Sequence, residues 1–104
     1  MKQLTHNLLK LNFSGINLAD VEKIEFAFSQ NIGEKPLKTA QYPSNKVVNV
    51  AGNMVGVEWT SADTKLFEAG KDFYCDTRIA LKDSEYQPET PILKLKMTPT
   101  LFEA

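Results

Sequence analysis

Hydrophobic and polar residues alternate along most of this chain, which is the spacing of β-strands that bury one face and expose the other. In one such row, Ile24, Phe26 and Phe28 alternate with Glu25 and Ala27. The same pattern, with turn residues between the rows, predicts about seven short strands. These strands cover residues 9–13, 24–28, 37–42, 46–50, 54–59, 73–81 and 93–97.

A tight hairpin is predicted where two of these strands flank residues 51–53, which read Ala-Gly-Asn. In its second strand Val55, Val57 and Trp59 face one way, while the side chains between them face the other way. We expect this row to face the core. The large ring of Trp59 is therefore expected to be buried.

One short helix is predicted around residues 61–68. Thr60 and Asp63 have the spacing of a capping box, with Asp in place of the usual Glu. Gly70 stands where a left-handed C-terminal cap belongs. Two turns are too short to be stable alone, so we expect the helix to place Leu66 or Phe67 on the open end of a core.

Seven short strands at even spacing, with one brief helix, indicate an all-β fold. The pattern is typical of an immunoglobulin-like antiparallel β-sandwich. A chain of 104 residues is one domain's length. We therefore expect a single β-sandwich domain over residues 1–104.

The distribution of charged and apolar residues argues against nucleic-acid binding and membrane insertion. The formal net charge is -1, and the basic residues are scattered lysines apart from the single Arg78. No run approaches the roughly 18 apolar residues of a membrane span. Lys10 interrupts the apolar start at Leu8 and Leu9, so no secretory signal is predicted. The free Cys75 suits a reducing compartment such as the cytoplasm.

The residues with reactive side chains do not form a catalytic pattern. His6 is expected to be an exposed residue at a strand end, and Cys75 lies in an inward row as core filler. One Cys and one His are too few for a structural zinc site. The loop acids Asp83 and Glu85 lack the spacing of a calcium site, and no cleft is predicted between paired carboxylates. We therefore expect no enzymatic activity, no cofactor and no metal.

Interface residues are the remaining candidates. Tyr is enriched at protein interfaces, which makes Tyr74 and Tyr86 candidate contact residues. Leu101 and Phe102 form an apolar pair beyond the last strand. Such a pair either folds back onto the sandwich or docks on another subunit, and both alternatives stay open.

Two runs resemble a group of small prophage proteins from Gram-positive gut bacteria. Residues 24–30 match a strand of the form I-x-F/V-x-F/Y-x-Q, and residues 57–70 match an element of the form L-T-x-x-D-T-x-x-F-x-x-G. Thr77 and Arg78 then match the order of a later strand, whereas Trp59 stands where the group more often has Leu. The order is also similar to the N-terminal β-sandwich domain of phage upper baseplate proteins.

This resemblance implies a non-catalytic structural or assembly component of a phage or prophage particle, associated with the tail or baseplate. Such a protein is made in the bacterial cytoplasm and enters the virion. Its partners would be copies of itself or a phage tail protein. The alternative is a small glycan- or cell-surface-binding β-sandwich module that uses exposed Tyr or Trp and loop carboxylates. Exposure of Trp59 discriminates between the two.

Overall fold

The computed structural model describes residues 1–85 and 87–101. Within these residues the chain forms seven strands, one 3-10 turn and one short α-helix. The strands are β1 (Asn7–Asn12), β2 (Val21–Ser29), β3 (Lys38–Tyr42), β4 (Val47–Ala51), β5 (Met54–Trp59), β6 (Asp72–Leu81) and β7 (Leu93–Lys96). The 3-10 turn η1 spans Leu18–Asp20, and the helix α1 spans Ser61–Lys65.

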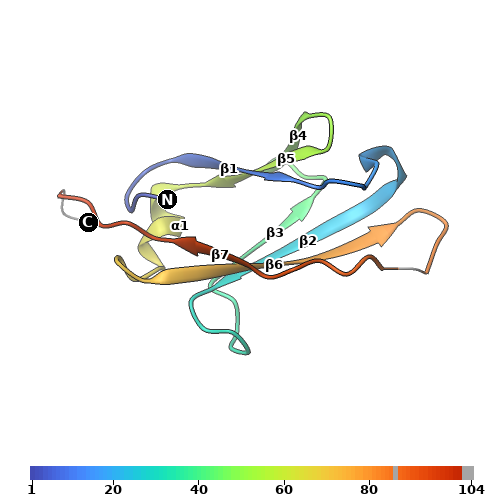
Figure 1. Ribbon diagram of the computed structural model, residues 1–104. Helices are drawn as coiled ribbons and strands as arrows, with labels where there is room; N and C mark the ends of the chain where they lie inside the picture. Colours follow the sequence, from blue (N-terminus) through green and yellow to red (C-terminus); the bar gives the residue numbers. More distant parts are fainter. Residues whose placement is uncertain (86, 102–104) are drawn as a thin grey trace.

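The strands form two antiparallel sheets packed as two layers (Figure 1). The three-stranded sheet has the order β1-β5-β4, and the four-stranded sheet has the order β3-β2-β6-β7. Every strand pairing within these sheets is antiparallel. The predicted all-β sandwich is confirmed.

The core lies between the two sheets and is filled by the inward rows of the predicted strands. Trp59 at the end of β5 is fully buried. Its ring centroid lies 4.9 Å from that of Phe28 on β2 and 5.4 Å from that of Phe73 on β6. Because aromatic pairs at such distances add to the burial of apolar area, this cluster joins one sheet to the other.

The β4–β5 hairpin forms where the sequence predicts it. Ala51 pairs with Met54, so the chain reverses through Gly52 and Asn53. Gly52 has a positive φ of 54°, which glycine adopts without steric cost. The register shifts between Asn49 and Ala51, which marks a β-bulge at the end of β4.

The capping box at α1 is confirmed, but the helix is shorter than predicted. The Thr60 hydroxyl accepts from the Asp63 N–H at 3.1 Å, and the Asp63 carboxylate accepts from the Thr60 N–H at 2.9 Å. The last turn tightens, because the Phe67 N–H donates to the Thr64 carbonyl three residues earlier. Phe67 thereby reaches the core, while Leu66 is left 55% exposed.

Gly70 does not cap this helix, which corrects the sequence-based expectation. It has the predicted positive φ of 83°. However, α1 ends at Lys65, and the Gly70 N–H donates to the Met97 carbonyl at 2.7 Å. Gly70 therefore turns the chain into β6 rather than ending the helix.

The first residues of the chain lie against α1 and the segment after β7, at one end of the sandwich (Figure 1). Lys2 forms a parallel bridge with Thr98, and the Thr98 N–H donates to the Met1 carbonyl at 2.7 Å. The Leu4 N–H donates to the buried hydroxyl of Thr64 at 2.8 Å. No helix in the described residues is long and apolar enough to cross a membrane.

Candidate functional site

The predicted interface residues occupy different parts of the structure. Tyr74 lies half-buried on β6, where its Cα partner is Ser29 on β2. Leu101 is fully exposed beyond β7. Tyr86 and Phe102 lie outside the described residues. Of the two candidates within residues 1–85 and 87–101, Tyr74 lines a depression on a sheet face, as described below.

The side chains that most often act as nucleophiles or proton carriers occupy different environments here. Cys75 is fully buried, and burial, together with the negative charge of Asp76, raises the pKa of its thiol to about 12. The thiol is therefore protonated near neutral pH and packs in the core as predicted. His6 is exposed, with its Nε2 3.9 Å from a carboxylate oxygen of Glu58. Among residues 1–85 and 87–101, no group of three or more His, Cys, Asp or Glu is placed to hold a metal ion.

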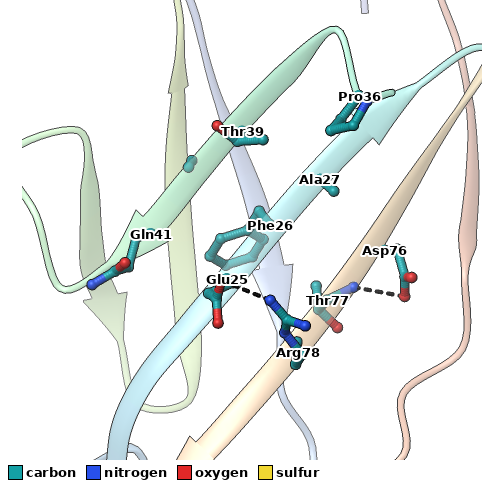
Figure 2. Close-up of a pocket in the computed structure, with 10 residues that line it drawn as sticks. Glu25, Phe26, Ala27, Pro36, Thr39, Gln41, Asp76, Thr77 and Arg78 are labelled. Atoms are coloured by element: carbon teal, nitrogen blue, oxygen red, sulfur yellow. Dashed lines mark hydrogen bonds and ion pairs between the residues drawn. The ribbon is translucent and has the colours of Figure 1, made fainter. Parts of the chain in front are cut away.

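A shallow groove runs over the outer face of the four-stranded sheet, and we call it the β2 groove (Figure 2). On β2, Ala27 has Thr39 of β3 and Asp76 of β6 as its Cα partners. The small Ala27 side chain leaves a hollow of about 560 Å³ between these neighbours, with Pro36 from the loop before β3 among its lining residues.

The charges beside the β2 groove are paired with one another. Arg78 Nη2 donates to a Glu25 carboxylate oxygen at 3.0 Å, and Lys23 Nζ lies 3.5 Å from the other oxygen. The hydrogen bond from Arg78 lowers the pKa of Glu25, and the same bond raises the pKa of Arg78. Both shifts move the pKa values away from neutrality, so both groups keep their charges at pH 7. The groove offers hydrogen bonds to a polar ligand, but this pair is not poised for proton transfer.

A second, smaller depression of about 130 Å³ continues from Ala27 and Asp76 toward Tyr74. Ile32, from the loop before β3, and Ile92, before β7, contribute to its lining. Both isoleucines are exposed. This end of the groove therefore combines one aromatic ring with apolar side chains, which is the part of the surface most suited to contact a ligand ring or an apolar side chain.

An apolar surface covers the outer face of the three-stranded sheet. Leu8 of β1 and Val48 of β4 are each 43% exposed, and Val50 of β4 is 38% exposed. A Cβ atom at Gly56 of β5 would lie 2.8 Å from Leu8 Cγ and 2.9 Å from Val50 Cγ2. The side chains of Leu8 and Val50 thus converge over Gly56 and form one apolar ridge across the sheet.

We call this surface the Gly56 face. Its members are the outward residues of the three strands together with Lys46 just before β4, namely Leu8, Lys10, Asn12, Lys46, Val48, Val50, Ala51, Met54, Gly56 and Glu58. Sequence alternation predicted the outward direction of the β5 residues but missed the apolar neighbours. Two adjacent leucines at 8–9 and two adjacent valines at 47–48 break the alternation. In each pair one residue must face outward, and this is the feature of the sequence that indicates an exposed apolar surface.

Comparison with protein-family models, with curated protein sequences and with solved structures gives no match to this chain. The function of this protein is therefore inferred from its residues and their geometry. The resemblance to prophage proteins remains an expectation from the sequence.

Some of the residues that carry this resemblance lie where α1 closes one end of the sandwich, whereas Thr77 and Arg78 lie on β6 beside the β2 groove. The Gln30 amide donates to the Glu68 carbonyl at 2.8 Å and accepts from the Glu68 N–H at 2.7 Å, so it joins the end of β2 to the segment after α1. Thr64 holds Leu4 through its hydroxyl, and Phe67 fills the core beside Trp59 at 5.1 Å between ring centroids. These roles are structural.

An ion pair links this closed end to the edge of the four-stranded sheet. Lys38 of β3 has its Nζ 3.1 Å from an Asp63 carboxylate oxygen. Only 9% of the Lys38 side chain is exposed to solvent. The same Nζ lies 5.2 Å from the centroid of the Trp59 ring, within cation–π distance. Lys38 therefore fixes the position of α1 over the aromatic cluster.

Stability is expected to fall on acidification as Asp63 is protonated. Partial burial alone would raise the pKa of Asp63, but the Thr60 N–H and the Lys38 ammonium outweigh it, and the net pKa is lowered. A carboxyl whose pKa is lower in the folded state contributes stability above its unfolded pKa of about 3.9, and that stability is lost as pH falls through the folded value. Urea unfolding between pH 7 and pH 3 measures it. Asp63→Asn should be less stable at pH 7 and should lose less stability than the wild type on acidification; equal losses in both proteins would contradict this role.

Proposed function

We propose that this protein is a non-catalytic structural or assembly component of a phage or prophage particle, associated with the tail or baseplate. It is made in the bacterial cytoplasm and carried into the virion. It acts by presenting a rigid β-sandwich to copies of itself or to a phage tail protein. The resemblance of residues 24–30 and 57–70 to prophage proteins supports a role in a phage particle. The surface of the sandwich supports the proposal that the protein acts through contacts with other proteins.

The Gly56 face is the observation that carries this proposal. Three large apolar side chains, Leu8, Val48 and Val50, stand together on one sheet face at 38–43% exposure. Scattered single apolar residues are normal on a protein surface, whereas a contiguous group on a flat sheet favours a protein contact. The interior is closed by the aromatic cluster and by the capping box at α1, so the surface is held by a rigid scaffold.

Mass spectrometry of purified particles tests the proposal. Lysogens carrying the gene are induced, particles are purified on a density gradient, and their proteins are quantified beside the major tail protein. We expect this chain at a fixed ratio to the tail protein across the particle fractions. Absence of the chain from particles that contain the tail protein would overturn the proposal.

A glycan-binding module is the second candidate function, because the β2 groove supplies polar groups and the half-buried Tyr74 lines the depression that continues from it. Trp59 cannot stack on a sugar, since it is fully buried. Glycan binding would therefore depend on Tyr74. A glycan array with the wild type and Tyr74→Ala tests this function. Binding that the substitution abolishes would favour the module over the particle component.

A further inference from the structure

We infer that the Gly56 face binds a second copy of this chain, in a two-fold dimer whose axis runs along the ridge from Leu8 across Gly56 to Val50. This inference rests on the proposed function, since it names the partner for the surface that carries it. The positions that strand pairing gives to the outward residues support a second copy as the partner.

The register places the outward residues on a grid of three strands and three rows. Glu58 of β5 lies beside Leu8 of β1, and Gly56 lies between Lys10 of β1 and Val48 of β4. Met54 ends the central strand, between Asn12 of β1 and Ala51 of β4. Val50 lies in the β-bulge just before Ala51, at the corner opposite Leu8. The side chains of Leu8 and Val50 converge over the centre of the grid at Gly56.

A two-fold axis along this diagonal exchanges the remaining positions in three pairs, one of which is Asn12 with Lys46. The axis sets Leu8 against its own copy and Val50 against its own copy, which forms a continuous apolar seam. It also places Lys10 of one copy over Glu58 of the other, and Met54 of one copy over Val48 of the other. Two-fold interfaces must be self-complementary in this way. The strands of the two copies then cross at a steep angle, as in orthogonal sheet packing.

The charges on the face support a second copy rather than an unrelated apolar partner. In the described part of the chain, Lys10 has no acidic partner within ion-pair distance. Glu58 has exposed His6 at 3.9 Å and retains a partly exposed carboxylate. Each dimer would form two Lys10–Glu58 pairs at the rim of an apolar seam, which is the anatomy of a specific interface.

The contact is small, because it is one three-stranded sheet face. Interfaces that bury less than about 1,200 Å² in total are typically weak. We therefore expect the dimer to form in a concentration-dependent manner, and to be measured at roughly 100 μM protein and above. The glycine at the centre of the face is required for this contact, because a side chain at position 56 would displace Leu8 and Val50 from the seam.

Reciprocal charge reversal tests the inference by analytical ultracentrifugation. Lys10→Glu alone sets two glutamates against each other across the axis, and Glu58→Lys alone sets two lysines against each other. Each single variant should raise the dimer dissociation constant about tenfold or more. An equimolar mixture of the two variants restores opposite charges at both sites, so it should form a heterodimer at least as readily as the wild type forms a homodimer.

The control variant is Lys35→Glu, which makes the same charge change on the exposed loop before β3 and should leave the dimer unchanged. Circular dichroism of every variant verifies folding. As a second measurement, Leu8→Cys in a Cys75→Ser background should form a disulfide-linked dimer on mild oxidation, whereas Leu66→Cys in that background should not. A monomeric wild type at these concentrations, single variants that dimerise as the wild type does, or a mixture that stays monomeric would each overturn the inference.

These outcomes are separable from those of the proposed function. A monomeric protein found in purified particles would contradict the dimer and support the particle component. A dimer that follows the charge-reversal pattern but is absent from particles would support the dimer and contradict the proposed role in the particle.

Discussion

Trp59→Ala is expected to remove most of the stability of this domain, at a cost of about 3–5 kcal/mol. The ring contacts Phe28 of one layer and Phe67 beyond α1, at centroid distances of 4.9 and 5.1 Å. The Trp59 ring lies between the two sheets and the closed end of the sandwich. Its removal therefore leaves a cavity bordered by β2, β5 and the segment after α1. Stabilities of small domains lie at roughly 5–15 kcal/mol, so this substitution brings the domain close to unfolding. Urea unfolding followed by circular dichroism measures the change.

Trp59→Phe is the matched control for this substitution. The buried Trp59 Nε1 has no hydrogen-bond partner among the described residues, so replacing the indole by a benzene ring removes a buried polar group at no loss of a hydrogen bond. We expect a loss well below that of the alanine variant. Equal losses for Phe and Ala, or a midpoint unchanged in the Ala variant, would show that the ring does not join the layers as described.

Thr64→Val is expected to destabilise the domain by about 1–3 kcal/mol, although it conserves the shape of the side chain. Thr64 is fully buried, and its hydroxyl accepts from the Leu4 N–H while it donates to the Ser61 carbonyl at 2.8 Å. Valine leaves both backbone groups without this partner. Thermal melting measures the loss of stability, and hydrogen exchange at residues 3–5 measures the release of the first segment.

Thr39→Val makes the same change on the exposed face of β3 and serves as the control. Exposed substitutions of this kind usually change stability by less than about 0.5 kcal/mol. If the two valine variants melted at the same temperature, the hydroxyl of Thr64 would not hold the first segment of the chain.

Local features of this fold could be predicted from the sequence because short-range physics determines them. Alternation placed the strands, residues 51–53 marked the hairpin, and the spacing of Thr60 and Asp63 gave the capping box. The inward position of Trp59 also followed from alternation. In each case the signal lies within a few residues of the feature.

Contacts between distant segments could not be predicted in this way. Nothing in the first residues indicates that Lys2 pairs with Thr98, because that pairing depends on where β7 ends in space. The exchange of hydrogen bonds between Gln30 and Glu68 likewise depends on two elements that meet only in the folded chain. The role of Gly70 could not be predicted for the same reason, since its bond to Met97 is a tertiary contact.

The candidate contact surface was only partly predictable. Tyr74 was proposed from composition, and it does line a depression on the four-stranded sheet. The Gly56 face escaped prediction because adjacent apolar residues, as at 47–48, leave open which of the two points outward. Strand pairing resolves this ambiguity: Val47 is buried and Val48 is exposed.

Site-specific photo-crosslinking in induced cells shows whether the Gly56 face is the surface through which this protein assembles. A benzophenone amino acid is placed at Val48 on that face, or at Thr39 on the outer face of the other sheet, and particles are irradiated during assembly. We predict a crosslinked product for position 48, at the mass of two copies of this chain, and none for position 39. Crosslinks from position 39 with none from position 48 would show that this protein does not assemble through the Gly56 face.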